Sequence, residues 1–127
     1  MKRNTFFLSI LFFSIFIFSC ATASGSYVLT GKQKTETTSD KVQIYTELPP
    51  EYEIIGIVTA TSAATGDKQK DLNYAIDELK IQAAKIGANG IIIDSIGSST
   101  SGGIVMYNMV IPIEAQNVSA KAIYVPE

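Results

Sequence analysis

The chain begins with a strongly apolar segment behind two positive charges. Lys2 and Arg3 are followed by an apolar run from Phe6 to Phe18 that is rich in phenylalanine, leucine and isoleucine. A positive segment before a short apolar one is the plan of a secretory signal peptide. The run is shorter than the ~20 residues that a membrane-spanning helix needs. The pattern therefore predicts a cleaved signal peptide over residues 1–19.

The end of this segment carries the only cysteine of the chain. The residues Phe16 to Cys20, FIFSC, resemble the lipobox of bacterial lipoproteins, in which a small residue precedes a cysteine that is acylated before cleavage. The resemblance implies that Cys20 is the lipid-bearing first residue of the mature protein, which its acyl chains hold at a membrane. Because Ala21 is not the aspartate that commonly marks inner-membrane retention, the resemblance further implies an outer-membrane location, facing the periplasm or the cell surface.

Polar residues dominate the segment after this cysteine. Residues 20–41 are rich in Ser, Thr, Gly, Lys and Gln, and such a composition buries too little apolar surface to offset the entropy of ordering. We therefore expect a flexible tether over residues 20–41. Its one apolar cluster, Tyr27 to Leu29, leaves a short edge strand open as an addition. The folded domain is expected over residues 42–127.

The clearest periodicity in the chain predicts a helix from Asp67 to Ile86. Asp67 is the expected N-cap, and Gly87 suits the left-handed position that ends helices. Apolar residues recur at helical spacing along one stripe, the expected core face. The stripe consists of Leu72, Ala75, Ile76, Leu79, Ala83 and Ile86.

Apolar and β-branched segments predict five strands around this helix. They are residues 42–45 and 53–61 before it, and residues 90–96, 104–113 and 118–125 after it. Gly56 indicates a bulge in the second strand. The Gly-rich and Ser-rich residues 97–103 are expected to form a hairpin loop. A phosphate cradle is disfavoured there, because the segment lacks a Gly-Lys-Ser/Thr ending and no helix follows it. The order β-β-α-β-β-β predicts a single α/β (α+β) domain, one helix packed on a mostly antiparallel sheet.

Composition narrows the possible partners and cofactors. The chain has 10 Lys and Arg against 12 Asp and Glu, and two of the basic residues would leave with the signal peptide. A mildly acidic protein lacks the basic surface that a phosphate backbone requires, so we expect no nucleic-acid partner. The absence of histidine disfavours zinc or copper sites and a Ser-His nucleophile. We expect neither a cofactor nor a metal.

Carboxylates are the groups that remain for chemistry at a site. Glu47, Glu51 and Glu53 form a local acidic cluster, interpreted as a solvated turn in preference to a weak calcium site. Asp94 interrupts an apolar segment, where an exposed strand rim is favoured over a general acid. Together with Glu114 it defines an alternative function, a carboxylate-dependent envelope hydrolase, in which two carboxyls would lie about 5 to 9 Å apart.

One pair of residues on the predicted helix suggests a protein partner. Tyr74 and Ile81 fall opposite the core stripe, among charged residues. Two scattered exposed apolar residues are a common finding. The alternative is a small docking patch for an envelope protein or for a second copy of the chain.

Residues 52–58, YEIIGIV, and residues 78–93, ELKIQAAKIGANGIII, resemble the superfamily that holds the YbjQ-like proteins and the Rcs stress-sensor lipoproteins of the outer membrane. The Gly-Ala-Asn-Gly turn at residues 87–90 is the most specific part of this resemblance. The family implies a compact α/β domain that acts by contact with protein partners. The chain lacks the disulfide cysteines of the sensor branch. We therefore expect a membrane-anchored envelope lipoprotein that acts without catalysis, as a binding or stress-sensing module.

Overall fold

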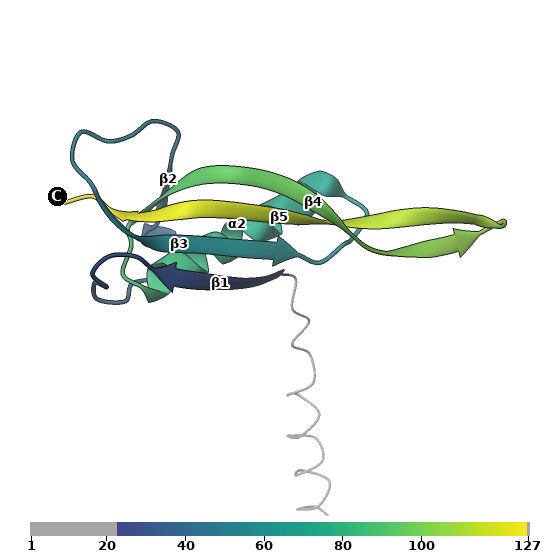
Figure 1. Cartoon of the computed structure of the whole chain (residues 1–127), viewed down its shortest axis with the longest axis horizontal. Helices are drawn as coiled ribbons and strands as arrows, with labels where there is room; N and C mark the ends of the chain where they lie inside the picture. Colours follow the sequence, from purple (N-terminus) through teal and green to yellow (C-terminus); the bar gives the residue numbers. More distant parts are fainter. Residues whose placement is uncertain (1–22, 127) are drawn as a thin grey trace, which may run out of the picture.

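A five-stranded sheet with one helix on one face forms the protein in the computed structural model, which describes residues 23–126 (Figure 1). The strands are β1 (Ala23–Leu29), β2 (Gln43–Tyr45), β3 (Glu53–Ser62), β4 (Gly90–Met106) and β5 (Met109–Tyr124). They lie in the order β1-β3-β5-β4-β2, and every neighbouring pair is antiparallel except β2 beside β4. A short 3-10 turn, η2 (Ser39–Lys41), precedes β2. The α+β class and the single domain agree with the expectation from sequence.

The helix α2 (Lys68–Lys85) begins and ends at the residues that the sequence indicates. The Asp67 side chain accepts hydrogen bonds from the backbone N–H groups of Gln69 and Lys70, which have no partner within the helix. Gly87 follows the last turn with φ of 81°, a conformation that glycine adopts at little cost. The expected N-cap and C-terminal glycine are therefore confirmed.

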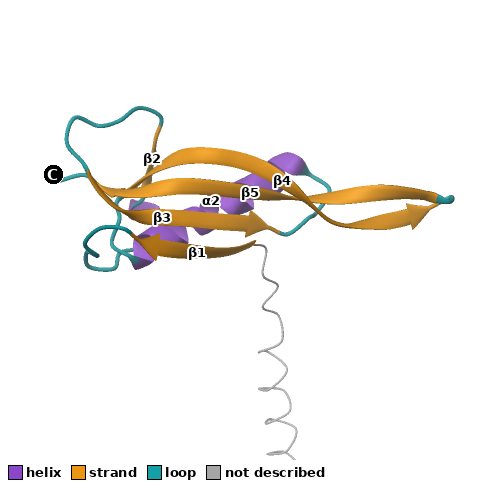
Figure 2. Cartoon of the chain, viewed as in Figure 1, coloured by secondary structure: helices purple, strands orange, loops and turns teal. Residues whose placement is uncertain are grey.

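The core lies between α2 and the face of the sheet that α2 covers (Figure 2). Much of it is alanine, so the helix can approach the sheet closely. The helix contributes Ala75, Leu79, Ala83 and Ala84, β3 contributes Ile55, Val58 and Ala60, and β5 contributes Val118, Ala120 and Ala122. Leu72 and Ile76 of the expected stripe are only half-buried, because they lie toward the side of the helix.

The tether expected over residues 20–41 is wrong from Ala23 onward. Residues Ala23 to Leu29 form β1, which pairs with β3 along its whole length. Composition misled the prediction because an edge strand can be stabilised by backbone hydrogen bonds while most of its side chains stay exposed. The Tyr27–Leu29 cluster is part of a longer strand.

The expected loop at residues 97–103 is also wrong. These residues continue β4, which pairs with β5 as far as Met106 and Met109. The chain reverses at Tyr107 and Asn108, whose φ angles are 51° and 63°, as a two-residue hairpin turn of type I′ requires. The order is therefore three strands, the helix and two strands, in place of the predicted β-β-α-β-β-β.

The outer halves of β4 and β5 extend beyond the helix and the other strands as a two-stranded hairpin (Figure 1). The pairing of β5 with β3 ends at Asn117, which lies opposite Thr61. Pro112 lies in the outer part of β5, where a missing backbone N–H is tolerated because the strand has a free edge there. Within the described sheet, this hairpin is the part that extends away from the hydrophobic core.

Candidate functional site

The face of the sheet that α2 leaves open has a shallow hollow, which is lined mostly by small polar side chains. Alternation along a strand places Thr59 and Ser119 on this face, opposite their buried neighbours. The hollow has a volume of about 260 Å³ and extends over β3, β5 and β4. The Ser26 and Thr59 hydroxyls are hydrogen-bonded at 2.8 Å. This face offers weak polar contacts and no charged cluster among the residues that line the hollow.

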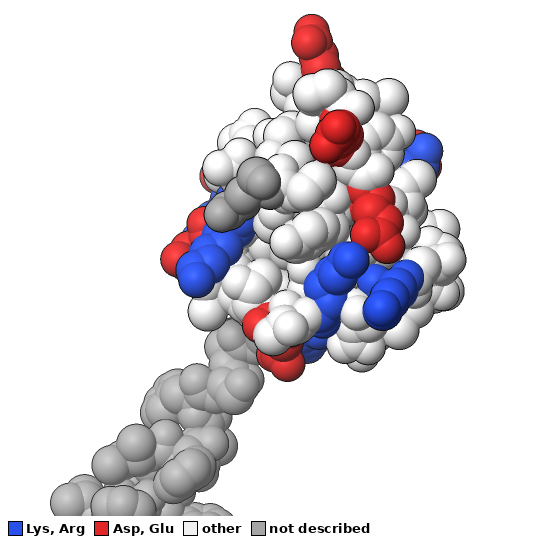
Figure 3. All heavy atoms as spheres, turned by 90° about the vertical axis from the view of Figure 1, so that its left-hand side faces the viewer, with Lys and Arg blue, Asp and Glu red and all other residues white. Residues whose placement is uncertain are grey.

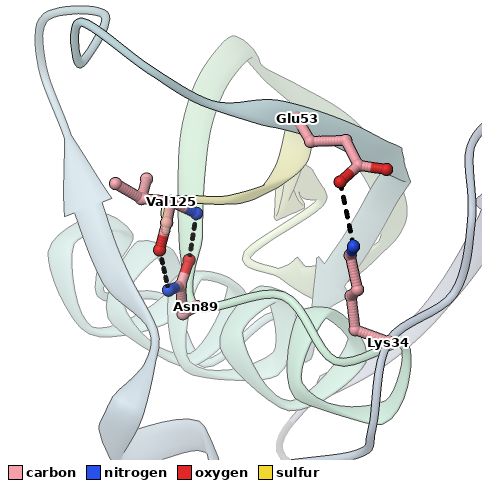
Figure 4. A network of polar contacts seen from close by, with 4 residues as sticks. All are labelled: Lys34, Glu53, Asn89 and Val125. Atoms are coloured by element: carbon pink, nitrogen blue, oxygen red, sulfur yellow. Dashed lines mark hydrogen bonds and ion pairs between the residues drawn. The ribbon is translucent and has the colours of Figure 1, made fainter. Parts of the chain in front are cut away.

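A larger hollow of about 860 Å³ lies at the end of the sheet opposite the hairpin. Two of the polar residues that line it, Lys34 and Asn89, are engaged within the protein (Figure 4). The Lys34 ammonium lies 3.0 Å from a Glu53 carboxylate oxygen and 5.1 Å from the centre of the Tyr124 ring. Asn89 is hydrogen-bonded to the backbone of Val125. These residues hold the end of the fold together.

Acidic and basic side chains are interspersed on this end of the molecule (Figure 3). Near the hollow, a hydrogen bond from the Thr38 side chain, helped by a backbone hydrogen bond, lowers the pKa of the Asp40 carboxyl. With both signs of charge present, the surface here has no single-sign patch that would attract a strongly charged ligand.

The Gly-Ala-Asn-Gly turn has a structural role at this end. The backbone of Gly87 lies against that of Lys34, and the segment at Lys34 to Thr37 donates hydrogen bonds to the last carbonyls of α2. Ala88 is fully buried. The turn therefore joins the end of the helix to the first loop and to the end of β5.

The candidate carboxylates are not brought together. Asp94 lies at an irregularity in β4 beside Ala120 and Ser119, five to six positions along β5 from Glu114. At about 3.3 Å per residue the two strand positions are about 17 to 20 Å apart, roughly twice the separation that paired glycosidase carboxyls need. Glu114 forms an ion pair with Lys68 at 3.2 Å. Among residues 23–126 no group of three His, Cys, Asp or Glu side chains could hold a metal ion.

The acidic cluster predicted before β3 is divided in the structure. Glu53 belongs to β3 and pairs with Lys34, whereas Glu47 and Glu51 lie exposed in the loop between β2 and β3. The interpretation as a solvated turn fits Glu47 and Glu51.

Tyr74 and Ile81 lie on the outer side of α2, as predicted. Ile81 is 41% exposed. Tyr74 is half-buried, and the Lys70 ammonium lies 5.8 Å from the centre of its ring. The two residues are separated by two helical turns, about 10 Å along the axis.

The strongest exposed apolar surface of the described residues is one that sequence reasoning missed, the hairpin tip. We define the tip as Val105, Met106, Tyr107, Asn108, Met109 and Val110. Its apolar members are all at least half exposed, and Tyr107 is 93% exposed. The signal was present in the sequence, since no charged residue occurs from Ser95 to Ile113. A contiguous exposed apolar patch indicates a contact surface.

The signal peptide and the lipidation site, Cys20, lie outside the described residues. Within residues 23–126, no helix combines the length and the apolar character that crossing a membrane requires.

Comparisons with known proteins show a fold and no family. No family model matches the chain, and no curated protein sequence matches it. Among solved structures the chain is similar to the crystal structure of a Francisella virulence factor, FvfA, with a TM-score of 0.52 and 18% sequence identity; the match covers 79% of this chain and 97% of that one. At this identity the similarity is one of fold alone, and the chain shares that overall fold.

Proposed function

We propose that this protein is a lipid-anchored lipoprotein of a bacterial cell envelope, whose domain acts by contact with a protein partner as a non-catalytic binding or stress-sensing module. The observation that carries the proposal is the segment FIFSC at residues 16–20, which resembles a lipobox, and the structure adds the position of β1. This strand begins at Ala23 and pairs with β3 from its first residue. Ala23 is three positions after Cys20.

A short connection has a physical consequence for an acylated Cys20. Three residues span at most about 11 Å when fully extended. Two or three acyl chains would anchor the cysteine durably, because each buried methylene contributes roughly 0.8 kcal/mol. The edge of the sheet would then lie at the surface of the bilayer. The outer membrane, facing the periplasm or the cell surface, is the location that the lipobox resemblance implies.

The outer side of α2 is the surface proposed for the partner. Tyr74 and Ile81 present apolar area on the side of α2 that faces away from the sheet. Aromatic and aliphatic anchors of this kind contribute much of the binding energy at protein interfaces. The resemblance to the YbjQ-like and Rcs sensor proteins supports a role by contact.

The alternative, a carboxylate-dependent envelope hydrolase, has less support. The strand positions of Asp94 and Glu114 are about 17 to 20 Å apart by register, and Glu114 forms an ion pair with Lys68. No other observation on the described residues favours it.

The decisive experiment is mass spectrometry of the intact protein isolated from its native envelope. We expect a chain that begins at Cys20 and carries the added mass of two or three acyl chains. The variant Cys20→Ala should be absent from the membrane fraction. The matched variant Ser19→Ala, which keeps a small residue before the cysteine, should remain in the membrane fraction. An unmodified Cys20 thiol, or a chain that still begins at Met1, would refute the proposal.

A further inference from the structure

The hairpin tip exposes apolar side chains on both of its faces. Val105 pairs with Val110, and Met106 pairs with Met109. Successive residues of a strand point to opposite faces, so the valine pair lies on one face and the methionine pair on the other. A protein surface docked against one face would leave the other in water. An apolar medium that surrounds the tip would cover both.

The chemistry of the hairpin changes gradually from its base to its tip. The tip is apolar, and the exposed residues Ser98 to Thr100 nearer the base are polar but uncharged. No charge occurs from Ser95 to Ile113, whereas the opposite end of the molecule carries charges of both signs (Figure 3). A charged side chain is costly in the hydrocarbon of a bilayer, whereas polar groups are tolerated near its interface. This distribution is complementary to a lipid surface.

Tyr107 at the turn points to a contact that the fold itself does not supply. Its φ of 51° is a left-handed conformation that residues other than Gly, Asn and Asp adopt only with strain. Its side chain is 93% exposed, so intramolecular packing does not compensate for this strain. Tyrosine is enriched where one end of the ring can be apolar and the other wet, as at a membrane interface.

The base of the hairpin and the start of β1 lie together. Ala23 pairs with Ser62, and the Ser62 hydroxyl accepts a hydrogen bond from the backbone N–H of Gln116 at 3.0 Å. Cys20 is three residues from Ala23. We propose that the hairpin tip inserts into the bilayer that the acylated Cys20 occupies and is a second membrane contact of this protein. This inference rests on the proposed anchoring.

Geometry limits how the tip can enter the bilayer. Met109 is seven positions before Gln116, which corresponds to about 23 Å of strand, whereas the connection from Ala23 to Cys20 can span at most about 11 Å. The hairpin must therefore lean toward the membrane plane when both contacts are made. Each strand of the outer hairpin has one free edge, and unpaired backbone groups are costly in hydrocarbon. Only the tip enters, to the depth of about 5 to 10 Å typical of interfacial segments.

The chain has no tryptophan, so Tyr107→Trp introduces a single fluorescent reporter at the tip. The full-length lipoprotein carrying this substitution is reconstituted in vesicles of phosphatidylethanolamine and phosphatidylglycerol, with or without brominated acyl chains. We expect bromine to lower the fluorescence of the introduced indole about twofold, with a blue-shifted emission, because a tip at interfacial depth lies close to the acyl chains. Tyr52→Trp, in the loop before β3 at the other end of the sheet, should be unaffected.

Two further variants test the cause of the quenching. Val105→Asp and Val110→Asp, each combined with Tyr107→Trp, should abolish it. Far-ultraviolet circular dichroism of both variants should remain that of the parent, because both valines are exposed. Quenching that persists with an aspartate beside the reporter would overturn the proposal.

Other outcomes separate this inference from the proposed anchoring. If the lipoprotein floats with the vesicles while the reporter at the tip is not quenched, the anchor stands and the membrane contact of the tip is refuted. A blue shift that depends on protein concentration and not on bromine would assign the tip to a second copy of the chain and would refute the lipid contact. If the natural Cys20 proves unmodified, the chain from Cys20 onward can be coupled to a maleimide lipid through this single cysteine. The same bromine quenching measurement then tests whether the tip inserts.

Discussion

The side-chain amide of Asn89 forms two hydrogen bonds with the backbone of Val125, donating to its carbonyl oxygen and accepting from its N–H, each at 2.7 Å (Figure 4). The backbone of Asn89 also accepts from Gln43 and donates to Ile123. One residue thus joins the turn after α2 to the end of β5 and the start of β2.

We expect Asn89→Ala to lower the free energy of unfolding by about 2 to 3 kcal/mol, because two part-buried backbone groups lose their partners. Chemical denaturation measures the change. Asn117→Ala, on the open face of β5, is the matched control and should cost less than about 1 kcal/mol. Equal losses in the two variants would show that the pairing with Val125 contributes little.

A comparison of Gly87 and Gly66 separates the cost of a left-handed backbone conformation from the cost of a steric clash with a neighbouring segment. Both have positive φ, but a Cβ at Gly87 would lie 2.5 Å from the backbone carbon of Lys34, whereas a Cβ at Gly66 would meet no atom within 4 Å. Gly66→Ala should therefore cost about 1 kcal/mol from its backbone conformation alone. Gly87→Ala should cost about 1 to 3 kcal/mol more, because the first loop must move away. Thermal or urea unfolding of the two variants tests the difference, and similar values would contradict the close contact.

Tyr107→Asn should stabilise the hairpin turn. Asparagine adopts the left-handed conformation at lower cost than tyrosine, by about 1 kcal/mol. We expect amide hydrogen exchange in the hairpin tip to slow about fivefold in the absence of membranes. Tyr52→Asn, outside the hairpin, should leave these rates unchanged. Faster exchange in Tyr107→Asn would mean that the tyrosine ring itself stabilises the turn.

Substitutions on the outer side of α2 test the proposed partner surface. Tyr74→Asp and Ile81→Asp should leave the domain folded and weaken capture of the partner about tenfold, which corresponds to about 1.4 kcal/mol. Crosslinking in the native envelope, followed by mass spectrometry, measures that capture. Asn73→Asp adds the same charge to a neighbouring exposed position and should have little effect. Capture that is unchanged in both test variants would remove this surface from the proposal.

The elements that the sequence predicts well are those in which local signals and burial agree. The helix has a capping aspartate, an apolar stripe and a terminal glycine, and all three are realised at Asp67, Leu79 and Gly87. The bulge expected at Gly56 is present as a register shift between Ile54 and Gly56 in β3. At these positions the tertiary structure reinforces the local preference.

The wrong predictions concern strands whose stability comes from pairing across the sheet. Ser98 to Thr100 have the composition of a loop, yet they pair with Gln116 to Glu114 in the long hairpin. Serine, threonine and glycine carry little information about such non-local hydrogen bonds. The turn escaped notice because Tyr107–Asn108 lacks the glycine that usually identifies a type I′ turn. The uncharged residues Ser95 to Ile113 were a sequence signal for the exposed apolar tip, but its position at the end of a hairpin depends on this non-local pairing.

The order of the strands has a consequence for how the molecule forms. β5, the last of the described strands along the chain, occupies the centre of the sheet and is the sole link between the β1-β3 pair and the β4-β2 pair of the described sheet. A ribosome that has not yet reached residue 109 therefore holds a chain whose two halves have no common strand partner. Folding of this kind depends on contacts distant in sequence and is slow compared with that of helical proteins. A nascent chain cut short before β5 should remain sensitive to protease, and the complete chain should acquire resistance in a single late step.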